Sequence, residues 1–176
     1  QRNSPVQIGT STWKAIAAGG SRSLGILSDD TLYAWGHNSS GQLGDGTTTQ
    51  RNSPVKIGTS TWKAIAAGYD HSLGIRSDNT LWAWGYNYYG QLGDGTTTQR
   101  TSPVQIGTST WKAIDGGLYH SLGIRSDDTL YAWGLNGSGQ LGDGTTTQRN
   151  SPVKIRTSTW KAIAAGNNHS LGIRGG

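Results

Sequence analysis

The sequence lacks several residue types, and each absence excludes a class of structure or chemistry. It contains no cysteine and no methionine, and all ten of its acidic residues are aspartate. Without cysteine the chain forms no disulfide framework, no thiolate metal site and no cysteine nucleophile. Without glutamate and methionine it is poor in helix formers, whereas tryptophan, tyrosine, threonine, valine and isoleucine supply its bulk, which favours strands. No apolar run approaches the length that spans a bilayer, so we expect no membrane insertion.

Charge is also scarce, and the basic excess is concentrated in one region. The formal net charge is +5, and only 14% of the residues are charged. All of this excess falls on residues 148–176, which hold five basic residues and no acidic one. The preceding 147 residues are balanced, so we do not expect the chain to bind nucleic acid. The first residue is not methionine, which suggests a processed product or a segment of a longer protein.

A repeat of 49 residues organises the whole chain. Trp35, Trp84 and Trp133 mark one position of the repeat, and four further tryptophans mark another: Trp13, Trp62, Trp111 and Trp160. Periods of this size indicate a solenoid, a propeller or a tandem array. We expect one repeat domain over residues 1–176, with units at 1–49, 50–98 and 99–147 and a partial unit at 148–176.

Each unit predicts four short antiparallel strands. In the second unit these are expected at 54–58, 62–68, 71–76 and 81–84, with a hairpin turn at 77–80 and a long polar loop from 90 to 100. A single sheet of four strands cannot bury both of its faces, but the next unit can cover it. The fold class is therefore predicted as all-β, with about 3.6 β-propeller blades of four antiparallel strands.

The repeat resembles that of the regulator of chromosome condensation family. The motif Leu-Tyr-Ala-Trp-Gly-x-Asn-x-x-Gly-Gln-Leu-Gly-Asp-Gly occurs at 32–46 and 130–144, and Trp82 replaces its tyrosine at 81–95. Pro-Val-x-Ile and Ala-Gly-x-x-His-Ser-Leu-Gly-Ile follow, and in one cycle Asp115-Gly116 replaces the usual Ala-Ala. The resemblance implies a seven-bladed propeller, and it also allows a module similar to a guanine-nucleotide exchange factor. It does not imply one function, because members of the family differ in what they do.

The ends of the array predict a further property. The chain opens with an expected edge strand at 5–8 and closes with two expected inner strands at 160–166 and 169–174. Unfinished blades expose strand edges, which tend to pair with other chains. One alternative function is therefore self-assembly of a secreted or surface protein into a ring or fibre. The low charge and the lack of cysteine and methionine favour an extracellular or cell-surface location.

Catalysis and metal binding find little support. His71, His120 and His169 recur with the period, but they belong to separate units, and we expect structural roles for them rather than a metal site. Each Gly-Asp-Gly loop has a single aspartate, which is too few for calcium and is typical of a turn. No Gly-x-Ser-x-Gly elbow or phosphate loop is present. We expect no enzyme activity and no cofactor.

The positions that differ between units give the main functional prediction. They fall just before the recurrent histidine and just after Trp-Gly, in loops that a four-stranded blade places on the same rim. The opposite hairpin varies only between aspartate and asparagine. Tyrosines with small polar residues are typical of binding loops such as antibody paratopes, although neutral drift of exposed loops is an alternative. We predict a non-catalytic scaffold that binds a protein or glycan. Its expected contact residues are Arg22, His37, Tyr69, Asp70, Tyr86, Tyr88, Tyr89, Asp115, Tyr119, Asn167 and Asn168.

Overall fold

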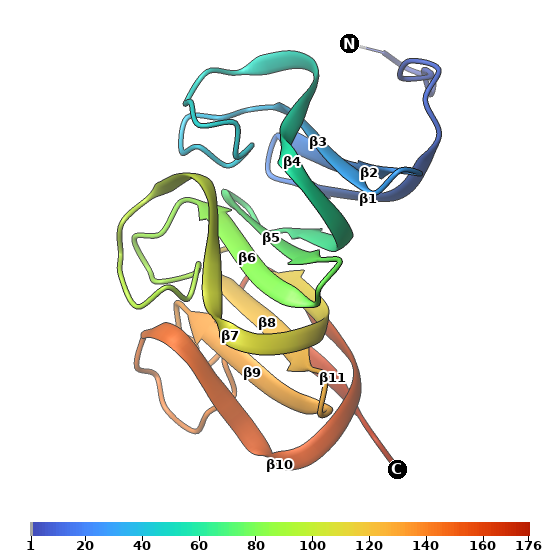
Figure 1. Ribbon diagram of the computed structural model, residues 1–176. Helices are drawn as coiled ribbons and strands as arrows, with labels where there is room; N and C mark the ends of the chain where they lie inside the picture. Colours follow the sequence, from blue (N-terminus) through green and yellow to red (C-terminus); the bar gives the residue numbers. More distant parts are fainter. Residues whose placement is uncertain (1) are drawn as a thin grey trace.

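The computed structural model describes residues 2–176 and shows a row of antiparallel β-sheets (Figure 1). No helix occurs within these residues. The strands are β1 Trp13–Gly19, β2 Arg22–Leu27, β3 Thr31–Gly36, β4 Arg51–Ala67, β5 His71–Arg76, β6 Thr80–Gly85, β7 Arg100–Gly116, β8 His120–Arg125, β9 Thr129–Gly134, β10 Arg149–Ala165 and β11 Ser170–Arg174. Each strand pairs with its neighbour in sequence, from β1 to β11. The all-β propeller architecture predicted from the sequence is confirmed.

Three long strands connect the blades. β4, β7 and β10 each have 17 residues, and each belongs to two sheets. The first half of β4 pairs with β3, as in Tyr33 opposite Lys56, whereas its second half pairs with β5, as in Trp62 opposite Arg76. Blade 1 therefore comprises β1–β3 and the start of β4, and blades 2 and 3 follow the same plan. The end of β10 and β11 form a two-stranded partial blade, and the array stays open.

The prediction of separate strands at 54–58 and 62–68 was wrong in one respect, because the chain runs through both without a break in β4. The strand predicted at 5–8 is also absent. Within residues 2–176 no third strand of a preceding blade lies beside this segment, so its backbone has nothing to pair with. Its equivalents in the later units pair with β3, β6 and β9. His169 lies just before β11 rather than in it.

The hydrophobic core lies between blades. Each blade has an aliphatic face and a tryptophan face, and the aliphatic face of one blade packs on the tryptophan face of the next. Between blades 1 and 2, Leu24 and Ile26 belong to the first face and Trp62 and Trp84 to the second, and all four are at most 1% exposed. The same arrangement recurs between blades 2 and 3. Between blade 3 and the partial blade, Leu122 and Ile124 pack against a single, partly buried tryptophan, Trp160. Fully burying such side chains stabilises the fold by about 1.5–3 kcal/mol each.

Glycine makes room for the tryptophan rings. A Cβ atom on Gly74 would lie 2.4 Å from Cζ3 of Trp62 on the adjacent strand, and Gly25 and Gly123 meet Trp13 and Trp111 in the same way. These glycines therefore accept a ring from their own blade.

Candidate functional site

The loops that vary between units lie side by side on one edge of the array. We call this edge the variable rim, and it consists of the loops at 20–21, 37–40, 69–70, 86–89, 118–119, 135–138 and 167–168. Backbone hydrogen bonds join the two loops of each blade, since His37 N donates to Ser21 O, Tyr86 N to Asp70 O and Leu135 N to Tyr119 O. The long loops that follow β3, β6 and β9 project from the same side of the molecule (Figure 1).

Four tyrosines of two blades form one cluster on this rim. Tyr86, Tyr88 and Tyr89 follow β6 in blade 2, whereas Tyr119 precedes β8 in blade 3. The ring centroids of Tyr89 and Tyr119 are 4.9 Å apart, those of Tyr86 and Tyr119 are 5.9 Å apart, and those of Tyr88 and Tyr89 are 5.1 Å apart. We call these four residues the tyrosine cluster. Tyr88 remains 65% exposed, and Tyr69 nearby is 49% exposed.

Asp70 borders the tyrosine cluster and is itself fixed in place. Its Oδ1 accepts a hydrogen bond of 3.0 Å from Nε2 of Gln42, which comes from the loop of blade 1. Partial burial raises the pKa of Tyr86, and the neighbouring tyrosines and Asp70 raise it further. The pKa of Tyr119 is raised as well, mainly by burial and next by the negative charge of Asp70. The phenols therefore stay neutral near neutral pH and present rings and hydroxyl groups beside one carboxylate.

The remaining predicted contact residues are spread more widely. His37 is exposed on the loop of blade 1, where its Nε2 lies 2.7 Å from Oγ of Ser39. Asn167 and Asn168 are exposed on the partial blade. Asp115 lies in the last part of β7, just before the loop at 118–119, and its Oδ2 accepts a hydrogen bond of 2.7 Å from the backbone N of Ala165.

Arg22 has a structural role that the sequence had not suggested. It is only 4% exposed, so it offers no contact to a partner. Its guanidinium donates to the backbone O of Gly68, Tyr69 and His71 and to Oγ of Ser72, all in blade 2. Burial lowers its pKa to about 10, with Asp70 opposing that change, and the group is still charged at neutral pH. Arg22 therefore joins blade 1 to blade 2 through hydrogen bonds.

The recurrent histidines have the equivalent role in later blades. Nε2 of His71 lies 2.9 Å from Oγ of Ser121, and Nε2 of His120 lies 2.9 Å from Oγ of Ser170. The Ser121 hydroxyl donates to the backbone O of Gln91 and is thereby left to accept from the imidazole. Each histidine thus joins its blade to the next one, and no group of three metal-ligating side chains occurs within residues 2–176.

The Gly-Asp-Gly loops are closed by an internal hydrogen-bond network. Asp94 Oδ1 accepts from the backbone N and Oγ1 of Thr96, and its Oδ2 accepts from Arg100. Asn87 is fully buried and donates to Asp94 and to the backbone O of Thr96 and Thr98. Asn38 and Asn136 occupy the equivalent position in the other loops and are also fully buried. The sequence identified these loops as turns but did not reveal the asparagine that closes them.

On the opposite rim, the hairpin position that varies only between aspartate and asparagine has an unusual backbone conformation. Asp30, Asn79 and Asp128 adopt φ angles of 71°, 67° and 70°. Aspartate and asparagine tolerate this left-handed conformation better than other non-glycine residues. The restriction to these two residues therefore has a conformational cause. The contrast between this hairpin and the variable rim does not decide between ligand binding and neutral drift as the reason why the rim loops vary.

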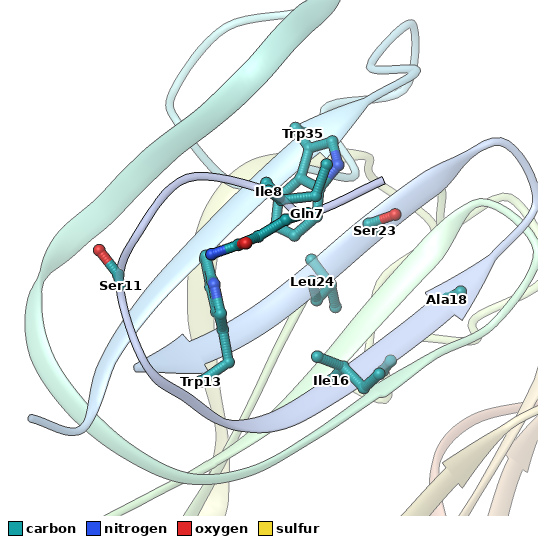
Figure 2. A pocket seen from close by; sticks show the side chains of 10 residues that line it. Gln7, Ile8, Ser11, Trp13, Ile16, Ala18, Ser23, Leu24 and Trp35 are labelled. Carbon is teal, nitrogen blue, oxygen red and sulfur yellow. The ribbon is translucent and has the colours of Figure 1, made fainter. Parts of the chain in front are cut away.

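Another feature that the sequence did not reveal is a cavity on the open side of blade 1. It has a volume of about 530 Å³ and its lining includes Trp13, Ile16, Ser23 and Trp35, with Gln7 and Ile8 passing over it (Figure 2). Its lining is the tryptophan face that the preceding blade covers elsewhere in the array.

Repeated four-stranded blades that share strands and bury tryptophans between them define this protein as an open β-propeller array. The chain belongs to the regulator of chromosome condensation (RCC1) repeat family, because one model of that repeat matches residues 29–75, 78–124 and 127–173. A second model of the same repeat matches residues 13–42, 62–91 and 111–140. No curated protein matches the chain.

Solved structures share the fold at low sequence identity. Prp20p from Saccharomyces cerevisiae, described with its binding to Gsp1p and histones, matches with 20% identity and a TM-score of 0.82 over 93% of this chain and 44% of its own. Yeast RCC1 (Prp20) in a structure with Kap60 matches with 24% identity and a TM-score of 0.81 over 95% and 42%. Human WBSCR16 matches with 19% identity and a TM-score of 0.61 over 97% and 60%. The chain thus spans less than half of the length of the two yeast structures.

Proposed function

We propose that this chain is a non-catalytic interaction module that binds a protein or glycan on its variable rim. The tyrosine cluster carries this proposal, because two loops from different blades bring four rings together where solvent reaches them. Tyrosine combines a large apolar face with a polar hydroxyl and loses little side-chain entropy on binding. Such residues dominate the binding energy of many interfaces. The similar yeast structures are described with Gsp1p, histones and Kap60 as partners, which is in keeping with a binding role.

The charges around the cluster favour a cationic group on the partner. Asp70 contributes a carboxylate, whereas Arg22 is buried and Arg100 is paired with Asp94 at 2.9 Å. A lysine or arginine side chain lying over the tyrosine rings gains a cation–π interaction, and Asp70 adds an ionic one. We therefore favour a basic protein segment over a neutral glycan as the ligand. Nucleotide exchange on a small GTPase rests on family resemblance alone, and no residue of this chain is assigned to it.

The test replaces Tyr86, Tyr88 and Tyr89 together with alanine and measures binding to arrays of basic peptides and neutral glycans. Wild-type protein should bind members of one array, and the triple variant should lose at least about tenfold in affinity for them. Lys63→Ala, on the opposite rim, is the control and should bind as wild type does. Equal binding by the triple variant and the wild type would contradict the proposal.

A second variant separates the two ligand classes. Asp70→Asn removes the charge and keeps the size of the side chain. A basic ligand should lose affinity, whereas a neutral sugar stacked on the tyrosine rings should be unaffected. Binding that depends on the tyrosines but not on Asp70 would therefore assign the rim to a neutral ligand.

A further inference from the structure

The loop that follows β6 carries three tyrosines that its own fold does not require. They are Tyr86, Tyr88 and Tyr89. The equivalent positions of blades 1 and 3 hold no tyrosine, and their residues are His37, Ser39, Ser40, Leu135, Gly137 and Ser138. All three loops nevertheless close in the same way, since Tyr89 N donates to Oε1 of Gln91 just as Ser40 N donates to Oε1 of Gln42. The loop therefore closes without the rings, and their presence in blade 2 calls for another explanation.

The three rings are arranged as two walls and a floor. The rings of Tyr86 and Tyr88 are nearly parallel, at 20°, and their centroids are 6.5 Å apart. The ring of Tyr89 stands at 71° to the first and 89° to the second, with centroids 6.3 and 5.1 Å away. We call these three rings the tyrosine box. A cation seated over their common centre lies within about 6 Å of every centroid, which is the range of a cation–π interaction.

Buried residues hold the tyrosine box in place. Asn87 and Gln91 are both fully buried beneath it. Oδ1 of Asn87 accepts from Leu92 N at 3.0 Å, and Oε1 of Gln91 accepts from Tyr89 N at 3.0 Å. From blade 3, the ring of Tyr119 packs on that of Tyr89 at 4.9 Å. A site that is already ordered loses less entropy when a ligand binds.

Hydrogen-bond acceptors beside the tyrosine box are already in use. The backbone O of Asp70 accepts from Tyr86 N, and that of Tyr119 accepts from Leu135 N. Oδ1 of Asp70 accepts from Nε2 of Gln42. A lysine ammonium brings three N–H donors, which lose water when they enter such a place and find few free acceptors. A trimethylammonium group has the same charge and no N–H to satisfy, and its methyl groups pack on the faces of aromatic rings.

We propose that the tyrosine box binds a quaternary ammonium group, carried by a trimethylated lysine of a protein segment. This inference rests on the proposed function of the variable rim and narrows its ligand. The rings supply cation–π interactions to the methyl groups, and the carboxylate of Asp70 attracts the charge. Unmethylated lysine is the weaker ligand, because its ammonium keeps more of its hydration in water than the box can replace.

The test titrates the full chain with short peptides that are identical except for one central side chain. This side chain is lysine, trimethyl-lysine or the neutral isostere of trimethyl-lysine, in which carbon replaces the nitrogen. NMR signals of the tyrosine rings report binding. The trimethyl-lysine peptide should bind at least about tenfold more tightly than either of the others. Choline is titrated in parallel, and choline that binds as tightly as the peptide would support the box while assigning it to a free quaternary amine.

Two substitutions of one wall separate the ring from its hydroxyl group. Tyr88→Leu keeps an apolar side chain and removes the ring, so the preference for trimethyl-lysine over its neutral isostere should fall at least about threefold. Tyr88→Phe keeps the ring and should keep the preference. Because Tyr88 is 65% exposed, both variants should fold as wild type does, and circular dichroism verifies this. Lys63→Ala, on the opposite rim, is the positional control and should bind all peptides as wild type does.

The outcomes distinguish failure of this inference from failure of the proposed function. Equal affinity for the lysine and trimethyl-lysine peptides, or for trimethyl-lysine and its neutral isostere, would overturn the inference. If the lysine peptide then still bound in a way that depends on the tyrosines, the proposed binding rim would stand. If the triple alanine variant of Tyr86, Tyr88 and Tyr89 bound every peptide as wild type does, the proposed function would fail together with the inference.

Discussion

At the scale of single residues, His71 and His120 join blades while remaining uncharged. Both are fully buried. Burial lowers the pKa of His71 to about 3, and the nearby charges of Arg22 and His120 contribute to the shift. Burial likewise lowers the pKa of His120 to about 4. In the unfolded chain both imidazoles titrate near their ordinary value of about 6.5.

Because these histidines are held neutral, we expect the fold to lose stability in mild acid, at pH values well above those at which carboxylates titrate. Below about pH 6.5 the unfolded chain takes up protons that the folded chain does not, so the free energy of unfolding falls as the pH drops. Each histidine should lower it by about 2 kcal/mol between about pH 7.5 and about pH 5. Urea denaturation at the two pH values measures the difference.

Two variants assign the effect to the buried histidines. His71→Gln should remove about half of the pH-dependent difference, whatever its own stability at neutral pH. His37→Gln alters an exposed histidine and should leave the difference as in wild type. A wild-type stability that is the same at both pH values would show that these imidazoles are not held neutral.

At the scale of elements, one asparagine closes each long loop of the variable rim. Asn87 donates to Asp94 Oδ1 at 3.2 Å and to the backbone O of Thr98 at 3.0 Å, and its own Oδ1 accepts from Leu92 N. Asn87→Ala leaves several of these buried groups without partners, and it should reduce the free energy of unfolding by about 2–4 kcal/mol. Urea denaturation measures the loss.

Asn52→Ala is the control for this loop. Asn52 is exposed, and its side chain accepts one hydrogen bond from Gln50. Its replacement should change stability by less than about 0.5 kcal/mol. If the two variants were equally stable, the network around Asn87 would contribute nothing beyond a surface contact.

The same elements show what the sequence could and could not reveal. The period of the tryptophans predicted the blades, and the alternation of Leu73 and Ile75 predicted the strand they occupy, because both patterns follow directly from strand geometry. The continuity of β4 could not be predicted, since it depends on which blade each half of the strand pairs with. The same holds for the segment at 5–8, which has the sequence of a strand but no neighbour to pair with.

Within the candidate site, the sequence predicted which residues lie on the rim better than it predicted which of their side chains are exposed. The loop positions of Tyr86 and Tyr119 followed from the repeat, whereas their contact at 5.9 Å depends on how neighbouring blades sit against each other. Arg22 occupies a position that varies between units, yet it is buried because the adjoining blade supplies carbonyl groups for its guanidinium. Position within a repeat gives the side of the blade but not the contacts to the next blade.

At the scale of the whole molecule, each blade is stabilised mainly by the blades beside it. Blade 2 has both faces covered, whereas blade 1 and the partial blade each have one face open. In arrays of this kind stability is approximately a sum of unit terms and nearest-neighbour interface terms, so the ends open more easily than the middle. Ile16, Leu171 and Ile173 mark the two faces from which such interface terms are missing.

This arrangement predicts graded protection of backbone amides against hydrogen exchange. Amides in β5, β6 and β8 should exchange slowest, because the sheets that hold them are covered on both sides. Those in β11 should exchange fastest among the strands, since only the end of β10 pairs with it, and β1 should be intermediate. The measurement uses mass spectrometry of peptic fragments at a concentration at which the chain is a monomer. Equal protection of all strands would mean that the array unfolds as one cooperative unit, and the nearest-neighbour description would then be wrong for this chain.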